Sequence, residues 1–175
     1  MSSSHPKDLP LAGRAFHLIG VGGAGMSVVA ELLAEHGARV TGSDANGGTA
    51  FERLAERGLG VVLGHAGANV PQDAVVVVST AIRDTNPELV TARERGQEVL
   101  HRSQALALAA TGRRFVAVAG AHGKTTTSGM LAEALTQAGE DPSFAVGGVV
   151  SALGSGAHLG SGDAFVAEAD ESDAT

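Results

Sequence analysis

Short apolar runs alternate with segments of helical periodicity along most of this 175-residue chain. Runs rich in β-branched residues predict strands, and apolar residues spaced three or four positions apart predict helices. The run AVVVVS at 74–79 predicts a strand buried on both faces, as a central parallel strand requires. The pattern predicts strands at 15–21, 39–42, 61–63, 74–79, 99–100 (at a sheet edge), 115–119, 143–146 and 164–168, and helices at 26–36, 51–57, 87–95, from 103 and at 124–138.

Residues at the ends of these helices support the prediction. Pro87 is placed at a helix start, where its missing amide hydrogen is tolerated, and Ser103 is predicted to cap the next helix. Glycines are placed to end four helices, at Gly37, Gly58, Gly96 and Gly139.

The regular alternation of strands and helices predicts an α/β fold with a parallel, doubly wound sheet. We place a domain boundary after Thr111, so that residues 1–111 form a first domain and residues 112–175 begin a second. The second segment offers three predicted parallel strands, joined by one helix and a loop rich in glycine and serine, which are too few to cover both faces of a sheet. We therefore expect the second domain to be incomplete in this chain.

Composition narrows the function classes. The net charge of −7 argues against a nucleic-acid surface, which would carry clustered positive charge. The chain has no cysteine, which excludes disulfides, thiolate chemistry and cysteine-based zinc sites. No signal-peptide pattern or long apolar stretch is present, so we expect a soluble cytoplasmic protein with no membrane partner.

A first glycine-rich loop lies between the first strand and the first helix. It spans Gly20–Gly25 and has the Gly-x-Gly-x-x-Gly spacing that lets a backbone approach a diphosphate at a helix start. Asp44, at the end of the second strand, is placed to accept a hydrogen bond from a ribose hydroxyl. NAD is the usual ligand of such a loop, another diphosphate-bearing nucleotide fits as well, and a turn that only permits packing is the alternative without a ligand.

A second glycine loop follows the strand FVAVA and opens a helix. Val118 stands where a full phosphate loop has glycine, so only the shorter pattern Gly-x-x-Gly-Lys-Thr remains. Backbone amides of residues 121–125 are expected to form an anion nest, Lys124 to reach the β- and γ-phosphates, and the Thr125 hydroxyl to bind Mg²⁺. His122 is expected to shape the loop. The predicted ATP-binding residues are Gly120, Ala121, His122, Gly123, Lys124, Thr125 and Thr126.

Further candidates lie at the ends of other strands. Glu168 ends the last predicted strand, where a carboxylate beside a phosphate loop is suited to anchor Mg²⁺. The acidic residues Asp170, Glu171 and Asp173 follow it, and a solvated turn is the simpler interpretation of them. His65 follows a strand end, where it either contacts a ligand or is an ordinary loop histidine.

The motifs, in this order, resemble those of the Mur ligases. The resemblance begins near residue 14 and rests on five segments, which are HLIGVGGAGMS (17–27), GSD (42–44), VVVVSTAIRDTNPE (75–88), AVAGAHGKTTT (117–127) and VAEADESD (166–173). It implies an ATP-dependent amide ligase of peptidoglycan synthesis, with a Rossmann-like domain that holds a UDP-sugar, a central ATPase domain and a C-terminal domain.

The resemblance also implies substrates and residue roles. The substrates are UDP-N-acetylmuramate and L-alanine, with the L-alanine site outside this chain, and the reaction passes through an acyl phosphate made with ATP and Mg²⁺. Lys124 and Glu168 are implied to be catalytic, with Thr125 and Glu168 as metal ligands. The implied UDP-sugar site comprises Gly20, Gly22, Gly23, Ala24, Gly25, Asp44, His65 and Ser79. The family usually has threonine at the position of Ala121, and phosphate binding should survive this change because a nest uses backbone amides.

Two other hypotheses stay open from the sequence. The first is another Mur-type amide ligase, such as one that recycles murein peptides, although the segment Gly22–Met26 favours the enzyme of synthesis. The second is a non-catalytic NAD-binding sensor, which would leave the Gly-Lys-Thr-Thr-Thr sequence of residues 123–127 without a role.

Overall fold

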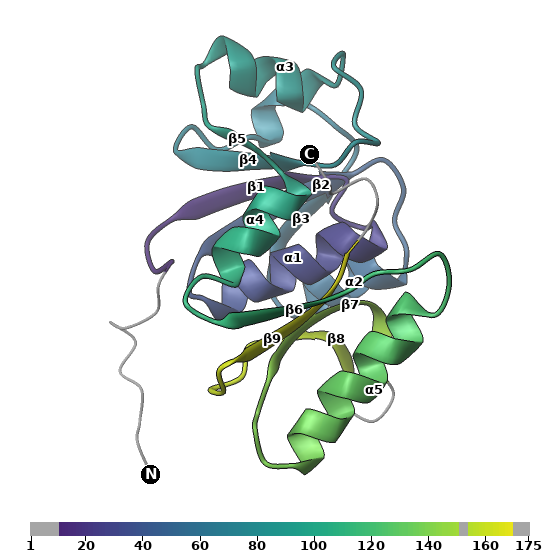
Figure 1. Cartoon of the computed structure of the whole chain (residues 1–175). Helices are drawn as coiled ribbons and strands as arrows, with labels where there is room; N and C mark the ends of the chain where they lie inside the picture. The colour runs from purple at the N-terminus through teal and green to yellow at the C-terminus, as the bar shows by residue number, and fades with distance from the viewer. Residues whose placement is uncertain (1–10, 151–153, 170–175) are drawn as a thin grey trace.

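The computed structural model describes residues 11–150 and 154–169. Two sheets form, and they lie one above the other with helices between them (Figure 1). The first part of the chain comprises β1 (Ala15–Ile19), α1 (Ala24–Glu35), β2 (Arg39–Asp44), α2 (Thr49–Glu56), β3 (Gly60–Leu63), the short 3-10 helix η2 (Gly67–Asn69), β4 (Ala74–Val78), α3 (Pro87–Glu94), β5 (Val99–His101) and α4 (Arg102–Ala109).

The first sheet is parallel throughout, with the strand order β3-β2-β1-β4-β5. Side chains of β1 alternate between its faces, so Phe16 and Leu18 pack toward α1, α2 and α4, while Ile19 packs toward α3. Helices therefore cover both faces, and the strand order reverses between β1 and β4. The predicted doubly wound fold and the edge position of β5 are confirmed.

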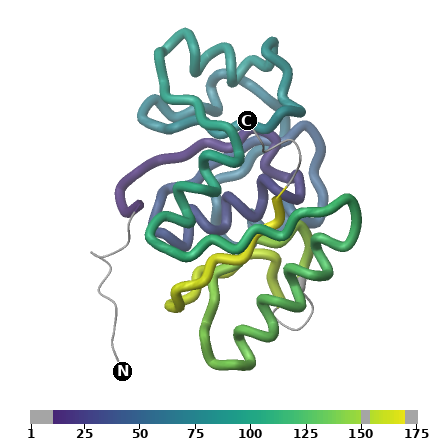
Figure 2. Tube along the Cα trace, viewed as in Figure 1, coloured from purple at the N-terminus to yellow at the C-terminus, as the bar shows by residue number. Residues whose placement is uncertain are grey.

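The second sheet comprises β6 (Arg114–Val118), β7 (Ser143–Val150), β8 (Ser155–His158) and β9 (Ala164–Glu168), and α5 (Lys124–Gln137) packs on its outer face. The strand order is β6-β9-β7-β8, so β6 and β9 lie side by side although they are far apart in the sequence (Figure 2). β6, β9 and β7 are parallel, whereas β8 is antiparallel to β7.

The sequence-based prediction of a loop between β7 and β9 was wrong for Ser155–His158. This segment lacks the apolar alternation of a strand, and it becomes one only by pairing with β7. A Cβ atom on Gly156 would lie 2.7 Å from the carbonyl oxygens of Val146 and Gly148. Glycine is therefore required at position 156, where β8 lies close to the backbone of β7. Because glycine is unfavourable in strands, this residue also makes the segment difficult to predict as a strand from the sequence.

The N-cap of α4 also differs from the prediction, which placed it at Ser103, by two residues. The N-cap is His101, whose ring Nδ1 accepts a hydrogen bond from the Ser103 amide at 3.3 Å. The Gln104 side chain completes a capping box by accepting from the His101 amide at 2.8 Å. Ser103 is thus inside the helix, and its hydroxyl lies 2.8 Å from His101 Nδ1.

Helix α1 lies between the two sheets and is buried on both sides. Residues 26–33 are buried without interruption. One face of α1 packs on the first sheet through Val29 and Leu33, and the opposite face packs on β7, β8 and β9 through Val28 and Leu32. A helix with apolar residues on two opposite faces is stable only when both faces are covered in this way. Within the described part of the chain, no helix combines the length and apolar character needed to cross a bilayer.

Two carboxylates on α1 link it to both of its neighbours. Glu31 is 1% exposed and forms ion pairs with Arg53 at 2.8 Å and Arg57 at 2.6 Å, both on or next to α2. Glu35 pairs with Arg57 at 2.9 Å and accepts a hydrogen bond from the Leu159 amide, just after β8, at 2.8 Å. These contacts fix the position of α1 relative to α2 and to the second sheet.

The buried carboxylate of Glu31 yields a stability prediction. Replacing both Arg53 and Arg57 by alanine leaves Glu31 buried without a cation, which should lower the free energy of unfolding by about 3–5 kcal/mol. The control is Arg39→Ala, which breaks an ion pair to Asp73 whose side chains are 63% and 67% exposed. That exposed pair should contribute less than about 1 kcal/mol. Urea unfolding of the three proteins measures both values, and equal losses would contradict the prediction.

Candidate functional site

The first glycine loop lies at the carboxyl edge of the parallel sheet, between β1 and α1. Gly20 has a φ of +78°, which L side chains rarely adopt, and its amide donates to the Ser43 carbonyl at 2.8 Å. The Gly22 amide donates to Asp44 Oδ2 at 2.8 Å, and a Cβ on Gly22 would lie 3.0 Å from that oxygen. Asp44 therefore shapes the loop directly, and its predicted contact with a ribose stays a prediction.

The loop leaves the first amides of α1 available. The N-cap Gly23 has no capping side chain, and its own amide donates to the Gly20 carbonyl at 3.1 Å. Among the described residues, no acceptor binds the amides of Ala24, Gly25 and Met26. Three free amides at a helix start, together with the helix dipole, favour an anion.

The second glycine loop has the same property at the start of α5. Gly120 and Gly123 have φ values of +149° and +78°, so both positions require glycine, and Gly123 is an N-cap without a capping side chain. No described residue accepts a hydrogen bond from the amides of 121–126, and the first helical bond runs from Thr127 to Gly123. The loop is exposed, and Lys124 Nζ donates to the Gly120 carbonyl at 2.8 Å. The ammonium group thus lies back over the loop.

Glu168 reaches the same place from the end of β9. Its Oε1 accepts a hydrogen bond from the Gly147 amide at 2.9 Å. A Cβ on Gly147 would lie 3.3 Å from Glu168 Oε2, and a Cβ on Gly148 would lie 3.3 Å from Thr125 Cγ2. The glycine pair in β7 gives the carboxylate and the threonine the room they occupy. Sequence reading ended this strand at Val146 and so missed the pair, although two adjacent glycines within a strand are a signal of close approach.

One cavity of about 270 Å³ connects the two loops. Ala24 and Gly25 line it from the first loop, Lys124 and Thr125 from the second, and Glu168 from β9. The burial of α1 between the sheets produces this arrangement, because it places the start of α1 and the start of α5 against the same space.

Arg102, at the start of α4, also lines this cavity and was not singled out from the sequence. Its guanidinium lies over Gly25, so that a Cβ on Gly25 would overlap Arg102 Nη1 and lie 3.3 Å from Cδ and Cζ. Gly25 therefore permits an arginine to lie beside the free amides of α1. A guanidinium and free amides side by side suit a carboxylate or a phosphate.

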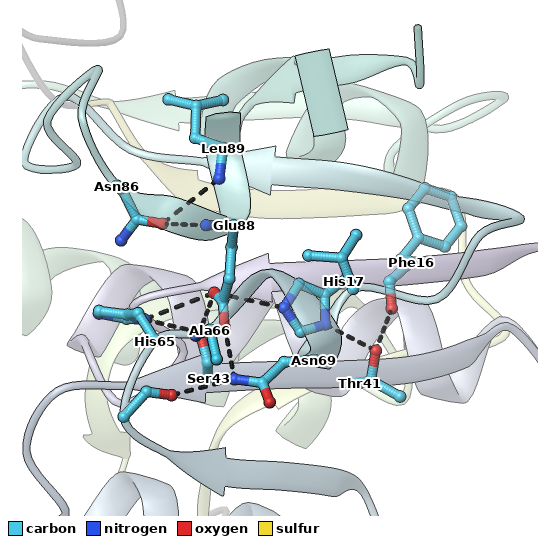
Figure 3. Close-up of polar contacts among 12 residues, drawn as sticks. Phe16, His17, Thr41, Ser43, His65, Ala66, Asn69, Asn86, Glu88 and Leu89 are labelled. Atoms are coloured by element: carbon cyan, nitrogen blue, oxygen red, sulfur yellow. Dashed lines mark hydrogen bonds and ion pairs between the residues drawn. The ribbon is translucent and has the colours of Figure 1, made fainter. Parts of the chain in front are cut away.

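A buried polar network lies on the other face of the same sheet edge (Figure 3). Its centre is Glu88 on α3, which is 0% exposed. Oε1 accepts from the Ala66 amide at 3.1 Å and from Asn69 Nδ2 at 2.6 Å. Oε2 contacts the Ser43 hydroxyl and lies 3.5 Å from His17 Nε2 and 3.4 Å from His65 Nδ1. The network ties β1, β2 and α3 to the segment after β3.

The network keeps Glu88 ionised in spite of its burial. Burial by itself would raise the pKa of Glu88, but the nearby His17 side chain and hydrogen bonds from Ser43, Asn69 and the Ala66 amide lower it to about 2. Asn86, the N-cap of α3, accepts from the amides of Glu88 and Leu89 at 2.9 and 3.3 Å, as Figure 3 shows. Glu88 is also in the first turn of its helix, where a negative charge is favoured.

The remaining predicted residues are placed as follows. Ser79 follows β4 at the carboxyl edge of the first sheet, and its carbonyl accepts from the Ile82 amide at 3.1 Å. His122 is exposed in the second loop. Asp170, Glu171 and Asp173 lie outside the described residues. Among residues 11–150 and 154–169, no three His, Cys, Asp or Glu side chains gather in a metal-binding group. The roles of Thr125 and Glu168 as metal ligands stay predictions.

Comparison of the amino-acid sequence with protein families and with curated proteins gives matches to the same kind of ligase. A model of the "Mur ligase family, catalytic domain" matches residues 15–114. The UDP-N-acetylmuramate–L-alanine ligase of Clavibacter michiganensis subsp. michiganensis is 50% identical over 166 residues, which cover 95% of this chain and 35% of the relative. The ligase of the same name from Renibacterium salmoninarum is 55% identical over 157 residues, which cover 90% and 34%. The chain thus spans about a third of the length of the curated relatives it matches.

Solved structures match across both sheets. The UDP-N-acetylmuramate-alanine ligase of Thermotoga maritima matches with a TM-score of 0.81 and 29% identity, over 89% of this chain and 36% of that one. The UDP-N-acetylmuramate:L-alanyl-gamma-D-glutamyl-meso-diaminopimelate ligase from Neisseria meningitides matches with a TM-score of 0.84 and 31% identity, over 91% and 53%.

The depressed pKa of Glu88 predicts a loss of stability in acid. Its folded pKa of about 2 lies below the unfolded value near 4.5, so its contribution is complete above pH 4.5 and disappears as the pH falls toward 2. The full contribution is about 3 kcal/mol. Glu88→Gln should unfold more easily at pH 7 and should lose less stability than the wild type between pH 4.5 and pH 2. Denaturant titrations at several pH values measure this, and parallel pH profiles for the two proteins would contradict it.

Proposed function

This chain belongs to the Mur ligase family, and from this premise we propose that it forms the sugar-nucleotide and phosphate-binding parts of a UDP-N-acetylmuramate–L-alanine ligase. The observation that carries the proposal is the cavity lined by both glycine loops. A ligase of this kind must bring a substrate carboxylate and the terminal phosphate of ATP together. The cavity has free amides of the first loop on one side and of the second loop on the other, so it can hold both negatively charged groups close together.

The choice of L-alanine as the amine rests on the relatives. Curated proteins 48–55% identical to this chain carry the name UDP-N-acetylmuramate–L-alanine ligase. The structural comparisons do not separate this reaction from murein-peptide ligation, since ligases of both names match with TM-scores of 0.81 and 0.83. The proposal therefore depends on sequence identity for the amine and on geometry for the phosphoryl chemistry.

The first loop is proposed to hold the UDP-sugar. The amides of Ala24, Gly25 and Met26 would bind the diphosphate at the start of α1, and the guanidinium of Arg102 would add positive charge beside them. The sugar, with its carboxylate, would then extend into the cavity toward Lys124.

The second loop is proposed to hold the phosphates of ATP. The free amides of residues 121–126 would surround the β- and γ-phosphates, and Lys124 Nζ would leave the Gly120 carbonyl to bind them. The Thr125 hydroxyl and the Glu168 carboxylate are hard oxygen ligands suited to Mg²⁺, which would neutralise phosphate charge when bound. Ala121 offers no hydroxyl, but the nest needs only its amide.

We propose that the reaction uses this arrangement as follows. An oxygen of the substrate carboxylate attacks the γ-phosphorus, the bond to the β-phosphate oxygen breaks, and ADP leaves with the bonding electrons. The acyl phosphate that forms is attacked by the amine of L-alanine, which loses a proton as inorganic phosphate departs. Lys124 and the amides stabilise the negative charge on the phosphoryl oxygens during transfer, and they serve chiefly by position and charge.

Lys124 provides the first test, in a full-length ligase that contains this sequence. Lys124→Ala should lower the rate of acyl-phosphate formation by roughly 100-fold or more, because the transferring charge loses its cation. The affinity for UDP-N-acetylmuramate, measured by calorimetry, should stay within about twofold because that ligand is held by the other loop. Gln137→Ala, at the exposed far end of α5, is the control and should retain normal activity. Ligation at the normal rate by Lys124→Ala would refute this assignment.

Gly25 provides the second test, because it controls the position of Arg102. Gly25→Ala should displace the end of the Arg102 side chain and weaken binding of UDP-N-acetylmuramate by roughly tenfold, as expected for loss of one charge-assisted hydrogen bond. The melting temperature should change little, since the far end of an arginine can move. Gly47→Ala is the matched control, because its Cβ would make only an ordinary contact of 3.7 Å with Leu63. Unchanged affinity in Gly25→Ala would show that Arg102 does not take part in binding.

A further inference from the structure

Two adjacent glycines in β7, Gly147 and Gly148, lie where the pairing of this strand becomes irregular. β7 pairs with β9 from Ser143 to Ala145, and its register with β8 shifts between Ala145 and Val150. Such irregularities are frequent beside functional sites. Neither glycine has a positive φ, so the backbone conformation alone does not require glycine. Glycine is needed because two side chains that line the cavity between the glycine loops lie close to this part of β7.

The carboxylate of Glu168 lies beside Gly147. β9 carries Glu168 next to Val118 of β6, and the Ala169 amide donates to the Val118 carbonyl at 3.0 Å, which fixes the backbone at this point. Oε1 of Glu168 accepts a hydrogen bond from the Gly147 amide at 2.9 Å, and a Cβ on Gly147 would lie 3.3 Å from Oε2. Gly147 therefore holds one carboxylate oxygen directly, and its missing side chain leaves room for the other.

The side chain of Thr125, at the start of α5, lies beside Gly148. A Cβ on Gly148 would lie 3.3 Å from the Thr125 methyl carbon Cγ2. Within residues 11–150 and 154–169, neither the Thr125 hydroxyl nor Oε2 of Glu168 has a hydrogen-bond partner. Both side chains line the same cavity. One carboxylate oxygen and one hydroxyl oxygen are therefore available together, and hard oxygen ligands of this kind fit Mg²⁺.

We propose that the glycine pair in β7 positions the two predicted Mg²⁺ ligands. Gly147 sets the orientation of the Glu168 carboxylate through its amide and through the space it leaves. Gly148 sets the position of the Thr125 side chain through space alone. This inference rests on the proposed function, which assigns both oxygen atoms to Mg²⁺ bound with ATP. Groups that orient metal ligands typically contribute about 10- to 100-fold to metal affinity.

The first test adds a methyl group beside the carboxylate, in a full-length ligase that contains this sequence. Gly147→Ala requires the Glu168 carboxylate to move by a few tenths of an ångström. Calorimetry measures the affinity for ATP with Mg²⁺ and with EDTA, and the ratio of the two affinities is the enhancement by Mg²⁺. Gly147→Ala should lower this enhancement roughly tenfold and leave the affinity in EDTA within about twofold. Gly47→Ala is the control, since its Cβ would make only an ordinary contact of 3.7 Å with Leu63.

Double variants distinguish positioning of the ligands from a general disturbance of β7. Gly148→Ala should also lower the enhancement, because its Cβ presses on the Thr125 methyl group. Thr125→Ser removes that methyl group and keeps the hydroxyl, so Gly148→Ala should have little effect when it is added to Thr125→Ser. Likewise, Gly147→Ala should have little effect when it is added to Glu168→Ala, which has no carboxylate to move. Melting temperatures establish that each variant is folded.

The dependence of the ligation rate on Mg²⁺ gives a kinetic test. In Gly147→Ala, half-maximal activity should require roughly tenfold more Mg²⁺, and kcat at saturating Mg²⁺ should approach that of the wild type. A lower kcat that added Mg²⁺ does not restore would contradict positioning of a metal ligand.

An unchanged enhancement in folded Gly147→Ala and Gly148→Ala would overturn the inference and leave the proposed function standing, provided the wild type binds ATP more tightly with Mg²⁺. Equal losses in the single variants and in the Thr125→Ser and Glu168→Ala backgrounds would also overturn it, because the glycines would then act on the backbone alone. A wild-type affinity for ATP that Mg²⁺ does not raise would overturn both the inference and the assignment of Mg²⁺. Failure of the wild type to bind ATP at all would overturn the proposed function as well.

Discussion

The enclosure of α1 between two sheets is the constraint on which the rest of this structure depends. The helix is apolar on opposite faces, and its sides pack on the first sheet and on β7–β9 at once. Its two carboxylates, Glu31 and Glu35, are matched by arginines of the first part of the chain and by an amide of the second. Because α1 cannot move relative to either sheet without exposing apolar surface, the start of α1 has a fixed position relative to the start of α5.

The two glycine loops use the same physical device. Neither α1 nor α5 has a side-chain N-cap, and the amides of their first turns bind no described acceptor. Backbone amides carry no net charge, so a chain with a net charge of −7 can still offer strong anion sites where a single Arg102 or Lys124 adds positive charge. The proposed phosphate site at the second loop would likewise need only the backbone amide of Ala121.

Buried charge serves two different purposes in the molecule. Glu31 is paired with cations and joins structural elements, whereas Glu88 accepts hydrogen bonds from the Ser43 hydroxyl, the Asn69 side chain and the Ala66 amide. In both cases the carboxylate is tolerated in the interior because each oxygen has partners.

The chain's own pattern determined most of the helices and strands, the parallel doubly wound sheet and the positions of both glycine loops, because apolar periodicity, helix-end residues and glycine spacing are local properties. It did not reveal β8, the cap of α4, the role of Gly147 and Gly148, or the presence of Arg102 beside Gly25. Ser155–His158 is a strand only because β7 lies beside it, and Gly25 matters only because a side chain from another helix crosses it. Tertiary packing likewise brings the two loops to one cavity. Gly25 and Lys124 are far apart in the sequence, and they line the same space only because both sheets pack on α1.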